Sequence, residues 1–449
     1  MGHHHISEVK NEKFEFTTRS KTVVGGVFIL GLVLTFLGIF QLKGTAEDEK
    51  HEASLIENVE HPTTDAVADH GHDVAADADQ AGEHSIASKR IWANFLLNAY
   101  YFMLFAIGAL VFLAVNYVAN AGWATLLKRV MEAMSSYLWV ALVTLLIVVY
   151  VGSGHLYDWL DVTGLVDMDP HSKAILEGKS WFLNSGWFKY GVPIILVIWI
   201  IIRTALRRYS IKEDQEGGLK YHRKSLRLSA AFIFIFAFSF SILTWLVLMS
   251  LDPLWYSTIY SVYNFAVAFV TGLTVMCFFT LYLKSKGYME AVSDEVVHDN
   301  GKFMFAFSIF WGYIFVSQFL LIWYANIPEE VVYFDVRLTP HFKPLWILNI
   351  FMCFVFPFLI LMMRNAKRNP KVLLIAGLII LAGHWLDLYL MIMPSVLGDA
   401  AHIGMLEIGM TVAFAGFFIY WVLNNLSKQN LYPINHPYLL ESVNHDVGV

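Results

Sequence analysis

The chain has 449 residues, of which 57% are hydrophobic and only 15% are charged, and its formal net charge is −6. Soluble domains carry a larger share of charged residues, so this composition excludes an ordinary soluble protein. No basic patch interleaved with aromatic side chains occurs, and nucleic-acid binding is therefore not supported.

Ten long apolar runs follow one another along the chain, and each is near the roughly 20 residues that cross hydrocarbon as a helix. The runs are Val23–Leu42, Ile91–Val118, Tyr137–Leu156, Phe188–Leu206, Ser229–Met249, Ser257–Leu283, Phe303–Asn326, Leu345–Met363, Val372–Met393 and Gly404–Leu423. They predict an all-α polytopic membrane protein with ten transmembrane helices.

Lysine and arginine gather on alternate connections between these runs. The clusters are Lys10–Lys21, Lys128/Arg129, Arg207–Arg227, Lys284–Lys302 and Arg364–Arg368. By the positive-inside rule, the N-terminal segment 1–22 and the C-terminal tail 425–449 are expected in the cytoplasm. The N-terminus has no cleavable signal pattern, so the first span, 23–42, is interpreted as a retained anchor.

The segment 43–90 is rich in Asp, Glu, Ala and His and has almost no large apolar residues. Such a composition cannot bury enough surface to offset the entropy of ordering, which predicts a mostly disordered external loop. Its histidines, such as His51 and His84, could bind a metal, but a solvated polar segment is the simpler reading.

Two cysteines, Cys277 and Cys353, lie inside predicted membrane helices. They cannot build a disulfide framework or a cysteine-rich iron–sulfur site, and no Cys-x-x-Cys-His motif for covalent haem occurs. If the protein takes part in electron transfer, a partner must hold most of the metal.

The second to fifth runs resemble the sixth to ninth, which suggests a duplication. The fourth run has Pro193 and ends in Arg-x-Ala-x-Arg, and the eighth has Pro357 and ends in a related Arg-x-Ala-Lys-Arg. Trp-Leu-x-Leu begins at both Trp245 and Trp385. We therefore expect two four-helix bundles, 91–253 and 254–393, in the same orientation, with the first helix and the tenth, 404–424, as additions.

Few ionisable side chains lie inside the predicted spans, where each is costly unless it is paired or wet. His384 and Asp387 lie three residues apart and hence on one helix face, and Glu407 and His402 follow near the outer end of the tenth run. A carboxylate and an imidazole in such a bundle could pass protons. The alternative is a satisfied polar contact between helices.

His155 and Asp158 repeat this spacing at the outer rim of the third run, where an ordinary interfacial contact is favoured over a proton path. A further polar band near the outer face includes Asp252, Tyr256, Tyr260 and Gln318. An apolar pocket with such groups could bind a quinol headgroup, although interfacial tyrosines are common in any membrane protein.

Three stretches carry a resemblance to a known family. They are Met249–Thr258 (MSLDPLWYST), Trp311–Gln318 (WGYIFVSQ) and Trp323–Glu330 (WYANIPEE). They resemble the F subunit of bacterial alternative complex III, a quinol:cytochrome c or quinol:acceptor oxidoreductase, which is itself similar to the polysulfide-reductase (NrfD-like) membrane subunits.

The resemblance implies a ten-helix subunit of the bacterial inner membrane that binds no cofactor of its own, apart from a candidate quinol such as menaquinol. It also implies partners that hold haem c and iron–sulfur clusters: a second NrfD-like subunit, a periplasmic iron–sulfur protein and multihaem cytochromes, with a terminal oxidase as a further candidate. In such complexes the related subunit is thought to hold the quinol, and this one to provide a proton path.

Two other classes remain open. Internal repeats and intramembrane carboxylates also suit a secondary transporter, although repeats in one orientation favour it less. A di-haem cytochrome b-like protein would use His155 and His384 as axial ligands, but the two histidines are expected at different depths.

Overall fold

The computed structural model describes residues 11–60, 72–160 and 169–445, except for the side chains of 43–85. The described chain is helical and has no β-strand beyond an isolated bridge between Lys13 and Asn430. The helices of the first half are α1 (Thr18–Glu60), α2 (His72–Val118), η2 (Gly122–Leu127), α3 (Lys128–Met134), η3 (Ser135–Tyr137), α4 (Leu138–Ile147), η4 (Val148–Gly152), α5 (Ser153–Leu156), η5 (Asp158–Leu160), α6 (Pro170–Lys179), η6 (Trp187–Gly191), α7 (Val192–Glu216), α8 (Lys220–Val247) and η7 (Met249–Leu251).

The second half is built in the same way from long helices with short helical pieces between them. These are α9 (Ile259–Ser285), α10 (Asp294–Ala325), α11 (Pro328–Arg337), α12 (Lys343–Ile350), η8 (Phe351–Val355), α13 (Phe356–Leu361), α14 (Arg364–Arg368), α15 (Pro370–Leu397), η9 (Gly398–Ala400), α16 (Met405–Leu426) and α17 (Leu439–Val443). Ten helical stretches are long and apolar enough to cross a membrane, and each contains most of one predicted run. The prediction of an all-α, multi-pass membrane protein is confirmed.

The long helices form two neighbouring groups. In the first half α2 and α7 both pack on α4 and α8, and in the second half α15 packs on α9, α12 and α13 while α10 packs on α9 and α13. The groups meet where α2 contacts α9. A Cβ atom on Gly108 would lie 2.1 Å from the Ala268 carbonyl oxygen, so glycine is required for this approach.

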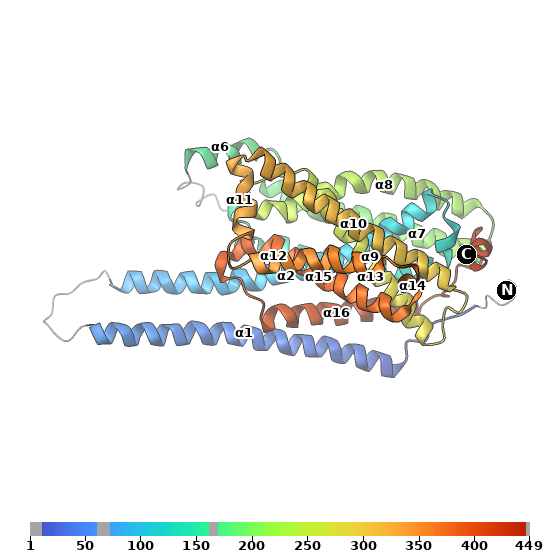
Figure 1. Cartoon of the computed structure of the whole chain (residues 1–449), viewed down its shortest axis with the longest axis horizontal. Helices are drawn as coiled ribbons and strands as arrows, with labels where there is room; N and C mark the ends of the chain where they lie inside the picture. Colours follow the sequence, from blue (N-terminus) through green and yellow to red (C-terminus); the bar gives the residue numbers. More distant parts are fainter. Residues whose placement is uncertain (1–10, 61–71, 161–168, 446–449) are drawn as a thin grey trace.

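The two helices outside these groups, α1 and α16, lie side by side along one edge of the molecule (Figure 1). Small residues bring their backbones together: a Cβ on Gly31 would lie 2.2 Å from the Ala413 nitrogen, and one on Gly409 would lie 2.4 Å from the Thr35 nitrogen. Only 11% of the membrane part of α1 is buried inside the chain. The rest of this membrane part therefore faces lipid or a partner.

The segments next to the two chain ends lie at the same end of the bundle, which we call the termini end. There the Leu431 nitrogen donates a hydrogen bond of 2.8 Å to the Glu12 carbonyl oxygen. The opposite end, called the far end, carries α6, α11 and the extensions of α1 and α2 (Figure 1).

The two prolines that suggested a duplication have the same local structure around them. A π-helical turn, η6, ends two residues before Pro193, and another, η8, ends two residues before Pro357. Proline cannot donate its backbone hydrogen bond and crowds the carbonyl four residues earlier, and a wider turn relieves this clash. In the first half that carbonyl, of Lys189, accepts a hydrogen bond of 2.8 Å from the Tyr150 hydroxyl.

Two parts of the chain differ from the expectation. Helices α1 and α2 continue into 43–60 and 72–90, where disorder was expected. Ala, Glu, Gln and Lys in these segments have high helix propensity, which allows a helix to form without a core. Residues 61–71 lie outside the described part. The third span begins at Gly122 rather than Tyr137. Lys128 and Arg129, expected on a loop, are therefore buried in helix α3.

Candidate functional site

The Asp387 carboxylate lies at the centre of the second bundle and is 2% exposed. Its Oδ1 atom accepts hydrogen bonds from the Tyr263 hydroxyl on α9 and, at 2.9 Å, from Asn349 Nδ2 on α12. Its Oδ2 atom accepts one of 3.1 Å from Trp311 Nε1 on α10. Three neighbouring helices thus donate to one carboxyl group on α15, and no Lys or Arg contacts it among the described residues.

His384, one turn before Asp387, is fully buried beside it. The two were expected on one face, and the His384 Nδ1 atom lies 3.7 Å from Asp387 Oδ2, longer than a hydrogen bond. The Cys353 thiol lies 3.6 Å from the same nitrogen. His384 Nε2 has no hydrogen-bond partner in the described structure. An imidazole with a free nitrogen next to a buried carboxyl group can accept or give up a proton.

The first bundle has a simpler counterpart of this site. When the two halves are overlaid in sequence, Tyr100-Tyr-Phe102 aligns with Tyr263-Asn-Phe265. The Tyr100 hydroxyl lies 3.1 Å from the Thr244 hydroxyl on α8. In the Trp-Leu-x-Leu overlay Thr244 matches His384, and Val247 matches Asp387. The tyrosine contact between helices is thus present in both halves, whereas the carboxylate is present in one.

A cavity of about 20 Å³ borders the Asp387 carboxylate. Its lining includes Asp387, Asn349, Gln318, Tyr333 and Arg337. This volume holds roughly one water molecule, and several of the lining groups are polar. A water molecule there would link the intramembrane carboxylate to Arg337.

Arg337, which the sequence analysis did not single out, is buried at the end of α11. Its guanidinium donates to the Leu390 and Met391 carbonyls at 2.8 and 3.0 Å and to the Ser395 hydroxyl at 2.8 Å. It also lies 3.4 Å from Asp252 Oδ2, which accepts a hydrogen bond of 2.7 Å from Ser395. Asp252 is therefore the outermost member of a polar chain that begins at Asp387.

The residues expected to bind a quinol do not surround one pocket. Tyr260 is buried against Tyr333, and burial, opposed by the Arg337 charge, raises the pKa of Tyr333 to about 12. Gln318 lies in the small cavity. Tyr256 is 57% exposed and lies below the Lys179 ammonium, which donates to three backbone carbonyls, those of Pro253, Leu254 and Trp255.

Glu407 belongs to a different cluster. Arg90 on α2 donates to both of its carboxylate oxygens, at 2.8 and 2.9 Å, and Asn94 donates to Oε1 at 2.9 Å. Arg90 also lies 2.7 Å from a ring nitrogen of His402. Glu407 in addition accepts a hydrogen bond of 2.8 Å from the Gly404 nitrogen at the start of α16. This arrangement holds α16 to α2, and no contact joins Glu407 to Asp387 among the described residues.

His155 and Asp158 lie at the rim of the far end. The His155 ring stacks on Trp92 and its Nδ1 lies 3.3 Å from the Ser88 hydroxyl, while Lys89 lies 3.3 Å from the Asp158 carboxylate. The Asp158 side chain is 76% exposed. None of these contacts involves a residue of the Asp387 site.

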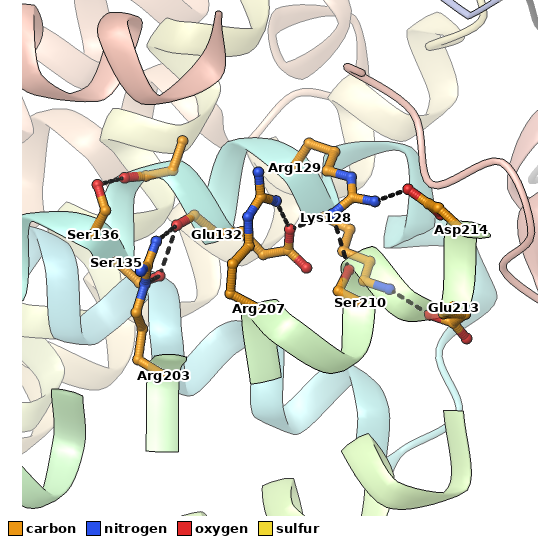
Figure 2. A network of polar contacts seen from close by, with 11 residues as sticks. Lys128, Arg129, Glu132, Ser135, Ser136, Arg203, Arg207, Ser210, Glu213 and Asp214 are labelled. Carbon is orange, nitrogen blue, oxygen red and sulfur yellow. Dashed lines mark hydrogen bonds and ion pairs between the residues drawn. The ribbon is translucent and has the colours of Figure 1, made fainter. Parts of the chain in front are cut away.

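A second buried network, at the termini end of the first bundle, was missed by the sequence analysis (Figure 2). Glu132 on α3 accepts hydrogen bonds from Arg129 and, across the helix pair, from Arg207 on α7. Arg203 donates to the Glu132 carbonyl at 2.9 Å, and Arg129 also pairs with Asp214. The third span is 35 residues, about 50 Å of helix, so its first turns extend beyond hydrocarbon about 30 Å thick.

One group of side chains in this region has the composition of a metal site. The ligand atoms of Glu213, His222 and His436 lie within 4.8 Å of one another. Glu213 Oε1 lies 3.5 Å from His222 Nδ1, and Lys128 donates to Glu213 Oε2 at 2.9 Å. Because the ammonium already neutralises this carboxylate, a divalent ion would have to compete with Lys128. Burial and the Lys128 charge lower the pKa of His436 to about 2.

In comparisons with known proteins, no family model matches the chain, and no curated protein is significantly similar to it.

Proposed function

We propose that the chain is an integral membrane subunit of a respiratory quinol:electron-acceptor oxidoreductase of the alternative complex III type, and that it transfers protons through Asp387. The observation that carries this proposal is the buried carboxyl group of Asp387, which receives donors from three other helices and borders a water-sized cavity. Ionisable groups placed in this way inside a membrane usually serve ion or proton transfer.

The stretches that resemble the family support the same site. Trp311 opens the second stretch and donates to Asp387, Gln318 closes it and lines the cavity, and Asp252 in the first stretch pairs with Arg337. Residues far apart in the sequence thus contribute to one polar chain. A family resemblance located in unrelated surface loops would give the proposal no such support.

The proposed proton route runs from Asp387 through the cavity, past the Arg337 guanidinium, to the Asp252 carboxylate. A proton leaving Asp387 would be carried by water beside Gln318 and Tyr333 and accepted by Asp252, whose side chain is 31% exposed to solvent. Arg337 stays charged throughout, because a guanidinium accepts no proton, and it positions Asp252. Glu407 and His402, expected on this route, are instead assigned to the contact between α2 and α16. The reason is that the Arg90 guanidinium donates hydrogen bonds to both carboxylate oxygens of Glu407.

Quinol oxidation is assigned to a partner subunit. Ligand pockets usually measure about 300–1000 Å³, and the cavity at Gln318 holds about 20 Å³. A cavity of about 1100 Å³ beside α1 has none of the residues expected to bind a quinol in its lining. In this proposal the iron–sulfur protein and the multihaem cytochromes carry the electrons, in a bacterial inner membrane, and this chain supports their assembly and the movement of protons.

A secondary transporter is the second candidate, and one observation favours it. The π-helical turns and prolines of α7 and of the η8–α13 span interrupt both helices at matching places, as broken helices do in many transporters. Purification from native membranes separates the two candidates: haem-containing and iron–sulfur subunits should accompany the chain if it belongs to an oxidoreductase. A chain that purifies alone and moves a solute would favour the transporter.

The decisive experiment replaces Asp387 with Asn in the intact complex. Asn keeps the size and most hydrogen bonds but cannot exchange a proton, so quinol turnover and proton release in reconstituted vesicles should both slow while assembly persists. Asp399→Asn, at an exposed position of the far end, is the matched control and should behave like the wild type. Normal turnover and normal proton release in an assembled Asp387→Asn complex would refute the proton route.

A further inference from the structure

A cavity of about 1100 Å³ lies between α1, α16, α15, α9 and α2. Its lining is mostly apolar and includes Phe102 and Phe105 of α2 and Ile408 and Leu423 of α16. Ile408 and Leu423 are separated by about 22 Å along the helix. The cavity is therefore long, and it reaches from the bundle interior to the lipid-facing helix α1.

The mouth of this cavity at the termini end is polar and basic. Arg19 and Lys286 line it together with Thr17, Ser20 and one acidic residue, Glu15. Arg19 and Lys286 are both exposed, and neither forms an ion pair with another described residue. Two cations and one carboxylate thus line one end of the site, an excess of one positive charge, and an apolar channel leads away from them.

We propose that this cavity binds an anionic phospholipid, with its phosphate between Arg19 and Lys286 and an acyl chain along α16. Basic pockets between transmembrane helices on one face of a membrane bind acidic lipid headgroups in this way. A quinol fits less well, because its headgroup is uncharged and gains nothing from the two cations. This inference is independent of the proposed function.

The lipid would also complete the packing of α1. The membrane part of this helix is held mainly by α16, through glycines such as Gly31 and Gly409, and Val23 and Val24 in its first turns line the cavity. A chain in the cavity would fill the space between α1 and α2. Bound lipid should therefore increase the resistance of α1 to dissociation from the bundle.

The experiment measures the lipid retained by the protein purified in mild detergent, after extensive washing, by solvent extraction and mass spectrometry. We expect about one anionic phospholipid per wild-type chain. Arg19→Gln with Lys286→Gln should weaken retention about thirtyfold, on the basis of about 1 kcal/mol for each basic residue. The matched control, Arg208→Gln with Arg223→Gln, removes two exposed cations outside the cavity and should retain the lipid.

A second variant tests the channel without changing charge. Ala382 lines the cavity, and Ala382→Phe should displace the acyl chain and lower the retained lipid while leaving the Arg19 and Lys286 mouth intact. Equal lipid content in all variants would overturn the proposal. Extraction of a quinone in place of phospholipid, or of no lipid from the wild type, would overturn it as well.

Discussion

The Tyr263 hydroxyl donates a hydrogen bond to the Asp387 carboxylate, and this bond joins helices α9 and α15. The two residues are 124 positions apart in the sequence. The corresponding tyrosine of the first bundle, Tyr100, meets only a neutral threonine hydroxyl. Both contacts join a tyrosine of one helix to a side chain of another, but the partners differ, and Thr244 aligns with His384 rather than with Asp387. They therefore allow the effect of a charged acceptor to be measured against a neutral one within the same molecule.

Tyr263→Phe should destabilise the second bundle by about 1–3 kcal/mol, because a hydrogen bond to a chargeable buried group is lost. Tyr100→Phe should cost less, about 0.6 kcal/mol, the average for polar contacts between transmembrane helices. Thermal unfolding in detergent measures both. We further expect that only Tyr263→Phe changes the pH profile of turnover, and equal effects of the two substitutions would contradict a special role of the Asp387 contact.

Arg90→Leu should be strongly destabilising, by about 3–5 kcal/mol, because it leaves the Glu407 carboxylate buried without its cation. Arg90→Leu combined with Glu407→Leu removes both charges and should regain most of the loss. The melting temperature of the purified chain provides the comparison. If the double variant is no more stable than the single one, the pair is not a desolvated ion pair of this kind.

Glu132→Ala should leave Arg129 and Arg207 without their shared acceptor at the termini end of the first bundle. We expect a loss of about 3–5 kcal/mol. Asp294→Asn is the contrasting change, because Asp294 forms an ion pair with Lys284 but its side chain is 80% exposed. Exposed pairs contribute about 0–1 kcal/mol, so this variant should melt close to the wild type.

Docking of the C-terminal tail should weaken at acidic pH. The pKa of His436, about 2 in the folded protein, is below the value near 6.5 of a free histidine, so only the undocked tail takes up a proton as the pH falls below about 6.5. The docking free energy is thus complete above pH 6.5 and about 2 kcal/mol smaller at pH 5.

Limited proteolysis of the tail at pH 7.5 and pH 5 measures this change. His436 faces Lys128, Glu213 and His222, and His436→Gln leaves those groups in place while removing the titrating ring. The variant tail should therefore show no pH-dependent cleavage below pH 6.5. Identical pH dependence in the wild type and the variant would assign the effect to another group.

Reporter fusions can establish the orientation in the membrane. The basic clusters predict that Gly218 and Gly287, in turns at the termini end, face the cytoplasm, and that His171 at the far end faces the opposite side. A labelling reagent that does not cross the membrane, applied to intact cells, should therefore modify the position of His171 and leave those of Gly218 and Gly287 unmodified. Labelling of Gly218 and protection of His171 would reverse the orientation and the direction of the proposed proton route.

The sequence predicted the membrane spans because long apolar runs and alternating basic clusters are local features. It also placed His384 and Asp387 on one face, since that needs only the helical repeat. Their partners could not be identified: Trp311 and Asn349 come from separate helices, and such residues are common in any membrane protein. Arg90 and Glu407 are separated by 317 positions, and nothing in the local pattern pairs them.

The basic residues at 128–129 and 203–207 show a limit of the positive-inside rule. Their positions agree with a cytoplasmic end, so the rule accounted for them without requiring partners. In the structure they form ion pairs with Glu132, Glu213 and Asp214. In the sequence these three acidic residues lie close to lysines and arginines, so they did not stand out as partners. A basic cluster can thus indicate orientation and also build the protein interior.

The π-turns beside Pro193 and Pro357 have an evolutionary consequence if the two halves descend from one ancestor. A feature present in both copies predates their separation, whereas Asp387, matched by Val247, distinguishes one copy from the other. The π-turn before the proline is then inherited by both halves, and the buried carboxylate belongs to only one of them. Because the helical scaffold is present twice, one half could lose the buried carboxylate, or the other could acquire it, while the common scaffold was kept.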